Sequence, residues 1–226
     1  MASIVRVHAP AAHRALFITS VALPLTGWTV HAVSLHRKLT AARRDPLTGL
    51  HGRDGYTAHA QQIINRHGSG SLVVLVDLDH FKKINDGPGG HATGDRVLAA
   101  TAQRLTAWAG PRGAVGRLGG DEFAATVRIP AARREARLAE LTDLLGEPVD
   151  VDGGRLVDVA ASIGAASPDI LGTTDLCLLQ RAADAAMYAG KHSGRAVLAD
   201  RTHAAVPSIN GRRAGRPGTS IVGAAA

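Results

Sequence analysis

The stretch Leu72-Val-Val-Leu-Val-Asp-Leu-Asp79 decides the fold, because five consecutive apolar residues lead directly into two carboxylates. A continuous apolar run of this length is typical of a central strand that is buried on both faces. Asp77 and Asp79 are two residues apart, so they would point to the same side of that strand. Two acids that close together repel each other and persist mainly where a divalent cation neutralises them. The alternative is that Asp79 caps the following helix.

A second acidic stretch, Arg117-Leu-Gly-Gly-Asp-Glu-Phe123, begins its Gly-Gly pair 40 residues after Asp79. Gly-Gly between two β-compatible runs predicts a hairpin, because the tight turns that join such strands need positive φ angles. An intervening helix would return the chain and bring the two stretches side by side. Four acids would then surround one site, as in the protein half of a two-metal phosphoryl-transfer centre. Magnesium fits oxygen ligands of this kind.

Helical and strand-like patterns alternate around these two stretches and predict a domain of the α/β class, an α+β sandwich. Helix patterns fall at about 53–67, 94–108, 131–145 and 174–190. Strand patterns fall at 72–78, 114–118, 123–129, 155–165 and 195–198.

The positive charge of the chain lies at its two ends. The formal net charge is +7, but the six basic residues of 1–44 and the four of 201–226 are not balanced by any acid. This leaves 16 basic against 19 acidic residues, a net charge of −3, between 45 and 200. With only 3% aromatic residues as well, that middle region lacks the basic stripe and stacking platforms of nucleic-acid-binding domains. We therefore expect no nucleic-acid partner.

The amino-terminal 44 residues divide into three parts. Residues 1–14 are basic, and residues 15–35 contain no acid, lysine or arginine. As a helix the second part would be about 31 Å long, enough to span a bilayer. The third part, 36–44, reads as a basic linker helix, and its charge would keep the following domain in the cytoplasm, on the inner face of the cell membrane. An amphipathic or dimer-forming helix on a cytoplasmic protein is the alternative.

Residues from about 43 to 200 resemble the GGDEF-domain diguanylate cyclases, and we assign the domain itself to residues 45–200. Six motifs carry the resemblance in the family's order: Asp45-Pro-Leu-Thr-Gly-Leu50; Val76-Asp-Leu-Asp-His-Phe-Lys-Lys-Ile-Asn-Asp86; Gly90-His-Ala-Thr-Gly-Asp95; Arg117-Leu-Gly-Gly-Asp-Glu-Phe123; Ala161-Ser-Ile-Gly164; and Arg181-Ala-Ala-Asp-Ala-Ala-Met-Tyr188 with Lys191 and Arg195 after it. The resemblance implies a nucleotidyl-cyclase or polymerase-palm-like fold, with a central mixed, mainly antiparallel sheet flanked by helices. It also implies a homodimer that condenses two GTP into cyclic di-GMP and releases pyrophosphate, using two magnesium (Mg²⁺) or manganese (Mn²⁺) ions per active site.

The resemblance also implies roles for individual residues. The metal ligands would be Asp77, the carbonyl of Leu78, Asp121 and Glu122, with Asp121 and Glu122 as the catalytic pair. Substrate contacts would come from His80, Phe81, Asn85, His91, Asp95, Gly119, Gly120, Lys191 and Arg195. Within that set, the backbone at His80 and Phe81 approaches the phosphates, Asn85 and Asp95 read guanine with His91 nearby, and Lys191 and Arg195 neutralise the phosphates. The alternative to phosphate binding is that Lys191 and Arg195 are ordinary basic residues at the end of a helix. Met187 and Tyr188 are expected in the core.

Three departures from the family pattern qualify these expectations. The loop Asn85-Asp-Gly-Pro-Gly-Gly-His91 carries one additional residue, which could shift Asn85 relative to Asp95. Gly52 replaces an Asn that would cap the following helix. Gly110-Pro-Arg-Gly113 stands where product-inhibited members have Arg-x-x-Asp, so no inhibition of that kind is expected. The other readings are a catalytically silent module that binds GTP or a protein partner, and a related cyclase or polymerase-palm enzyme that uses another nucleotide.

Residues 201–226 contain Pro, Gly and a run of terminal alanines without apolar periodicity, and this composition predicts a disordered tail. The only cysteine, Cys177, rules out an intramolecular disulfide and suits a reducing compartment.

Overall fold

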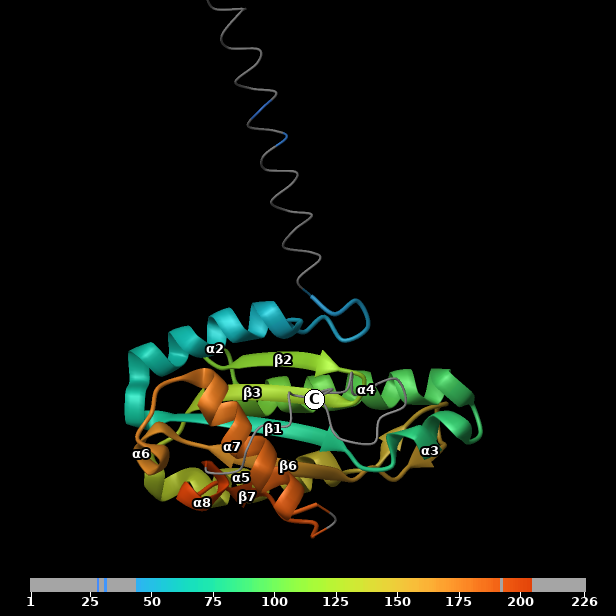
Figure 1. The fold of residues 1–226 in the computed structure, drawn as a ribbon. Helices are drawn as coiled ribbons and strands as arrows, with labels where there is room; N and C mark the ends of the chain where they lie inside the picture. The colour runs from blue at the N-terminus through green and yellow to red at the C-terminus, as the bar shows by residue number, and fades with distance from the viewer. Residues whose placement is uncertain (1–27, 29–30, 32–43, 192, 205–226) are drawn as a thin grey trace, which may run out of the picture. The chain divides into compact units, whose positions relative to one another are not determined.

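The protein is described by a computed structural model that covers Trp28, His31, residues 44–191 and residues 193–204. The chain divides into two compact units, Met1–Arg43 and Arg44–Ala226. In the first unit, Trp28 and His31 are helical and exposed. The second unit holds the sheet and every other element described below (Figure 1).

Five strands form one sheet in the order β2-β3-β1-β6-β7. Their bounds are β2 (Ala114–Gly119), β3 (Glu122–Arg128), β1 (Ser71–Leu78), β6 (Ala161–Ala166) and β7 (Val197–Leu198). All neighbouring pairs are antiparallel except β6 and β7, which run parallel. A separate two-stranded sheet joins β4 (Val149–Asp150) to β5 (Leu156–Val157). The expected mixed, mainly antiparallel sheet is therefore confirmed.

Helices cover both faces of the sheet (Figure 1). The first face packs against α2 (Arg53–His67) and α7 (Leu176–Ala189), and the second against α4 (Gly90–Ala109) and α5 (Arg134–Gly146). The shorter elements are α3 (Phe81–Asp86), α6 (Pro168–Leu171), α8 (Arg201–Ala204) and the 3-10 turns Gly68–Gly70 and Ala131–Arg133. These layers confirm the flanked-sheet architecture.

The central strand β1 is buried at all eight of its residues, as its apolar run predicts. Its side chains alternate between two cores. Val73 and Leu75 pack with α2 and α7. The core under α4 and α5 receives Leu72, Val74, Val76 and Leu78. Asp77 follows Val73 and Leu75 in the alternation, so it lies on the α7 side of the sheet.

Several expected boundaries differ from the structure. The helix expected at 94–108 begins at Gly90, the one expected at 131–145 begins with a 3-10 turn, and the strand expected at 155–165 is broken into β5 and β6. A helix after Asp79 was considered only as an alternative and without bounds, because the six residues of α3 are too few for a helical apolar pattern to appear.

The predictions for the two ends of the chain fall largely on residues outside the described part. Arg44 pairs with His51 in an isolated β-bridge, so the linker helix does not include it. Residues 201–204 form α8, and the tail prediction is wrong for them; the rest of the tail is not described. Of the predicted membrane helix at 15–35, only Trp28 and His31 are described. Among the described residues, no helix is both long and apolar enough to cross a membrane.

Gly164 on β6 allows α7 to lie directly on the sheet. A Cβ atom at this position would be 2.0 Å from the carbonyl oxygen of Ala183 and 2.5 Å from the backbone nitrogen of Met187. Both are backbone atoms of α7, so no side-chain rotation can relieve the clash. The glycine of the Ala161-Ser-Ile-Gly164 motif therefore has a packing reason.

We expect Gly164→Ala to lower the free energy of unfolding by about 3 kcal/mol, as overpacking of a tight contact does. Gly146→Ala is the matched control, because no atom lies within 4 Å of the added methyl group. Urea denaturation followed by circular dichroism would compare the two variants. Equal stability of both would show that α7 is not held against β6 as described.

Candidate active site

Three polar side chains form a row across the three central strands of the sheet, near the carboxyl end of β1. Asp77 on β1 lies opposite Glu122 on β3 and opposite Ser162 on β6 in the strand register. Directly opposed residues of antiparallel strands place their side chains on the same face of the sheet. Asp77 is only 3% exposed, whereas Glu122 is half-buried. The row therefore puts two carboxylates side by side at the edge of a dry core.

Lys191 supplies the positive charge for this pair. Its Nζ lies 3.1 Å from Oδ1 of Asp77, and it reaches the carboxylate from the loop that follows α7. Helix α7 ends at Ala189 with Gly190 as its C-cap, so Lys191 lies just beyond the helix end and Arg195 lies farther along the loop to β7. Arg195 is exposed, so it remains accessible to a ligand. Met187 is buried as expected, but Tyr188 is 70% exposed and is not a core residue.

A two-residue turn, Asp79 and His80, connects β1 to α3. Asp79 accepts a 2.8 Å hydrogen bond from the hydroxyl of Ser162, while α3 begins at Phe81 without a side-chain cap. The alternative that Asp79 caps this helix is therefore wrong. His80 has φ of 55°, the one positive φ of a non-glycine residue among those described. Left-handed backbone costs energy in such a residue and is concentrated at functional sites.

The turn between β2 and β3 joins the acids of the second motif to β1. Gly119 and Gly120 are exposed, and the backbone N–H of Leu78 donates to the carbonyl of Asp121 over 3.2 Å. A register shift between Arg117 and Gly119 marks a bulge before the turn. Asp121 therefore ends the turn and Glu122 begins β3 beside the end of β1, as the hairpin prediction requires.

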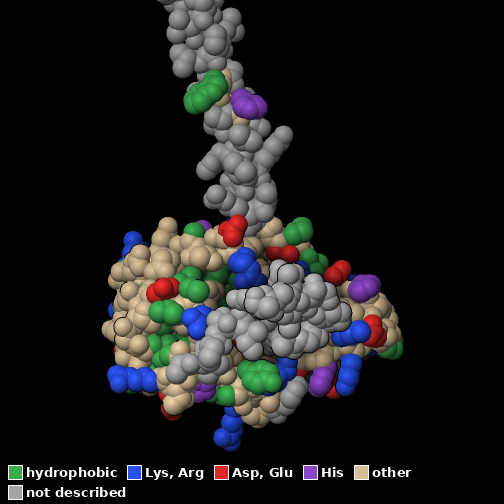
Figure 2. All heavy atoms as spheres, in the orientation of Figure 1, with side chains coloured by type: hydrophobic (Ala, Val, Ile, Leu, Met, Phe, Trp, Pro, Cys, Tyr) green, Lys and Arg blue, Asp and Glu red, His purple; other side chains and the backbone are tan. Residues whose placement is uncertain are grey.

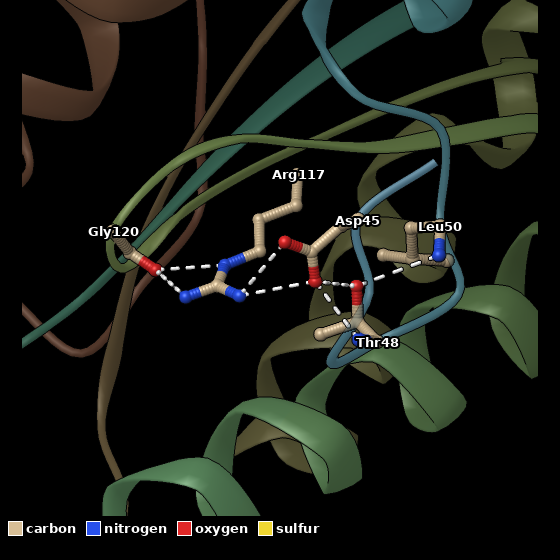
Figure 3. Close-up of polar contacts among 5 residues, drawn as sticks. All are labelled: Asp45, Thr48, Leu50, Arg117 and Gly120. Atoms are coloured by element: carbon tan, nitrogen blue, oxygen red, sulfur yellow. Dashed lines mark hydrogen bonds and ion pairs between the residues drawn. The ribbon is translucent and has the colours of Figure 1, made fainter. Parts of the chain in front are cut away.

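The guanidinium of Arg117 holds this turn in place (Figure 3). Its Nε and Nη2 donate to the carbonyl of Gly120 at 2.9 and 2.7 Å, and its Nη1 contacts both carboxylate oxygens of Asp45 at 3.0 and 3.1 Å. Asp45 in turn accepts hydrogen bonds from the backbone and the hydroxyl of Thr48. Burial alone would raise the pKa of Asp45, but the Thr48 hydrogen bonds and the Arg117 charge outweigh burial and lower it.

The residues expected to read guanine lie on two adjacent helices. Asn85 is on α3, and His91 and Asp95 are exposed residues of α4. A Cβ atom on Gly94 would be 1.9 Å from Oδ1 of Asn85, so the absence of a side chain at Gly94 lets Asn85 lie against α4 next to Asp95. The additional loop residue has not separated the two helices.

The acids offer oxygen donors that suit Mg²⁺, and the structure brings Asp77 and Glu122 together. Among the residues that the structure describes, however, no three His, Cys, Asp or Glu side chains converge closely enough to hold a metal ion. Asp79 accepts a hydrogen bond from Ser162, and Asp77 is paired with Lys191, so the arrangement of the four acids around one metal site stays a prediction. The donor set therefore fits the metal in its chemistry, and Asp77 is its best-placed member.

Two site residues were not identified from the sequence. Ser162 connects β6 to Asp79, and Arg117 connects the turn to Asp45. Both belong to motifs quoted above, so the sequence marked these residues as important but did not show which residues they would contact.

On the described surface visible in Figure 2, Lys and Arg side chains are scattered among acidic and apolar side chains and do not form a basic stripe.

Comparison with known proteins gives consistent matches. Residues 42–197 match the family described as "Diguanylate cyclase, GGDEF domain". An uncharacterized 19.3 kDa protein in the repSA 5′ region of Streptomyces ambofaciens is 50% identical over 173 residues, which are 76% of this chain and 91% of that protein. Diguanylate cyclase DgcN of Escherichia coli K12 is 37% identical over 158 residues, 68% of this chain but only 38% of that enzyme.

A solved structure gives the same result. The GGDEF domain of PA1120 (TpbB or YfiN) from Pseudomonas aeruginosa superposes with a TM-score of 0.62 at 32% identity, covering 71% of this chain and 96% of that domain. The sheet and the helices that position the acidic row therefore belong to a known architecture.

The contribution of the Asp45–Arg117 pair to the free energy of unfolding should depend on pH. Because the folded pKa of Asp45 lies below its unfolded value, the stabilisation is present above about pH 4 and is lost as the pH falls through the folded pKa. We expect Asp45→Asn to lower the unfolding free energy by about 1 kcal/mol at pH 7, with the difference from wild type shrinking below pH 4.

Asp143→Asn is the control, since Asp143 is an exposed residue of α5. Chemical denaturation at several pH values checks the expectation. A deficit of Asp45→Asn that is the same at pH 3 and pH 7 would contradict it.

Proposed function

The chain belongs to the GGDEF-domain diguanylate cyclase family, and from this premise we propose that it condenses two GTP molecules into cyclic di-GMP and releases pyrophosphate. The observation that carries the proposal is the buried carboxylate of Asp77, with Glu122 opposite it and Lys191 in contact with it. A buried charge costs free energy, so such a row is more readily explained by chemistry than by stability.

The proposed metal ligands are Asp77, the carbonyl of Leu78, Asp121 and Glu122, for two Mg²⁺ or Mn²⁺ ions per active site. These ions, when bound, supply Lewis-acid stabilisation of charge on the phosphates. Asp121 would accept the proton of the attacking 3′-hydroxyl, a role that suits its half-buried position in the turn just before β3. Glu122 would support the same site from the acidic row.

The phosphates would be held by the chain's own positive and backbone groups. Lys191 contacts Asp77 in the absence of substrate, and we propose that its ammonium turns to a phosphate oxygen when GTP binds. Arg195 would reach the same phosphates from the α7–β7 loop. The left-handed backbone of His80 would turn it and Phe81 toward the phosphates, next to Gly119 and Gly120.

Guanine would be read by Asn85 and Asp95. The amide of Asn85 offers a donor and an acceptor, and the carboxylate of Asp95 accepts hydrogen bonds, which complements the acceptor and donor groups of the guanine edge. The close approach of Asn85 to Gly94 supports their acting together. His91, one turn before Asp95 on α4, would lie nearby.

A homodimer is part of the proposal, because each domain holds one GTP and the two must meet with each 3′-hydroxyl facing the other's α-phosphate. The segment 15–44 would bring two copies together. The further proposal that 15–35 anchors the domain to the membrane rests only on its charge-free composition.

A second candidate function is a catalytically silent module that binds GTP or a protein partner. The additional residue in the 85–91 loop favours it, because guanine recognition would be the first property to suffer. GTP binding without turnover would distinguish this function from catalysis.

We expect the full-length chain, incubated with GTP and Mg²⁺ at high protein concentration, to yield cyclic di-GMP detectable by liquid chromatography. Asp121→Asn should lower the rate by about 100-fold or more, as loss of a general base does. Asp143→Asn, a removal of equal charge on the outside of α5, should leave the rate unchanged. No product from a wild-type chain that is shown to be dimeric would refute the proposal.

We also expect no product inhibition of the Arg-x-x-Asp type. Residues 110–113 form the tight turn between α4 and β2, and neither an arginine at its first position nor an aspartate at its last is present. Initial rates should stay constant when cyclic di-GMP is added at low micromolar concentration. Noncompetitive inhibition at that concentration would contradict this expectation.

A further inference from the structure

Arg155 binds the loop that carries the additional residue. Its Nη1 donates to the carbonyl of Pro88 at 2.7 Å, and its Nη2 donates to the hydroxyl of Thr93 at 2.9 Å. The same hydroxyl donates to the Pro88 carbonyl at 3.1 Å. Arg155 thus joins the loop between α3 and α4 to the first turns of α4. These contacts span 62 and 67 residues of sequence.

The guanidinium is itself held in a defined position. Its Nε and Nη2 donate to Oδ2 of Asp152 at 2.9 and 2.6 Å, within the turn that connects β4 to β5. Thr93 is 3% exposed, so its hydroxyl has little alternative contact with water. A charged donor between two fixed groups can keep a glycine-rich loop in one conformation.

Gly89 leaves the space that the guanidinium occupies. A Cβ atom there would be 2.3 Å from the Thr93 hydroxyl and 2.6 Å from Nη2 of Arg155. The backbone φ of Gly89 is also +91°, which side chains rarely adopt. The loop therefore accommodates Arg155 in two ways: Gly89 has no side chain to clash with the guanidinium, and the carbonyl of Pro88 accepts its hydrogen bond.

The loop so held connects the two residues proposed to read guanine. Asn85 precedes it on α3, and Asp95 follows it on α4. Arg155 also lines a cavity of about 430 Å³ whose lining includes Asp79 and His80, so this contact and the end of β1 border the same cavity.

We propose that Arg155 is a positioning residue for guanine recognition, which fixes Asn85 relative to Asp95 through the 87–90 loop. The inference rests on the proposed function. It assigns to the β4–β5 turn a part in nucleotide selectivity, and it explains how the chain accommodates an additional loop residue between α3 and α4.

The test compares steady-state kinetics of full-length variants with GTP and with inosine triphosphate, which lacks the exocyclic amine of guanine. Arg155→Ala should raise the KM for GTP about tenfold, as loss of a charge-assisted hydrogen bond would, with kcat within about twofold of wild type. The preference for GTP over inosine triphosphate should fall in parallel. Arg155→Lys should recover part of the KM, because its ammonium can still reach Pro88.

Thr93→Val, which keeps the side-chain volume and removes the shared hydroxyl, should change the KM in the same direction. Arg137→Ala is the matched control: Arg137 also pairs with an acid three residues away, Glu140, but its other contacts are with Trp108 between α4 and α5. It should leave KM and nucleotide preference unchanged.

A wild-type KM and preference in both Arg155→Ala and Thr93→Val would overturn the inference while leaving the proposed function intact. A fall in kcat with an unchanged KM would also overturn it, since it would show a structural role. If the wild-type chain neither turns over nor binds GTP, the proposed function fails first, and calorimetric titration of wild type with a non-hydrolysable GTP analogue separates the two cases.

Discussion

The burial of β1 at every residue is the constraint on which the rest of the structure depends. A strand covered on both faces cannot expose its last side chains to water, so the carboxylate of Asp77 must find its partners within the protein. Lys191 supplies the charge, and Glu122 and Ser162 complete the row. The ends of β1, β3, β6 and α7 consequently meet at one point.

A second set of contacts fixes the start of the domain to the β2–β3 turn. Arg117 connects the carbonyl of Gly120 to the carboxylate of Asp45, and His51 forms a bridge to Gly116 on the same strand. The first residues of the domain are therefore tied to the turn that carries Asp121 and Glu122. A change in the conformation of the chain around Asp45 would reach that turn through the Arg117 guanidinium.

Local patterns explain which parts could be predicted from the sequence. The apolar run of β1 and the Gly-Gly turn are signals within a few residues: the first predicted a buried central strand, and the second predicted the hairpin of β2 and β3. The bounds of α3 could not be predicted because it is shorter than two turns, and β5 and β6 were merged because the break between them has no proline or glycine. The bonds from Ser162 to Asp79 and from Arg155 to Pro88 cross 83 and 67 residues, and one sequence alone does not reveal such pairs. The resemblance identified the acids, but not that Lys191 would neutralise one of them.

We propose that the end of β1 and the α3–α4 loop together form one nucleotide site. A crystal structure of the chain with a non-hydrolysable GTP analogue and Mg²⁺ tests it most directly. We expect a metal ion on Asp77, Lys191 moved onto a phosphate, and the guanine edge hydrogen-bonded to Asn85 and Asp95. A nucleotide bound elsewhere, with the Lys191–Asp77 pair intact and Asn85 and Asp95 untouched, would contradict it.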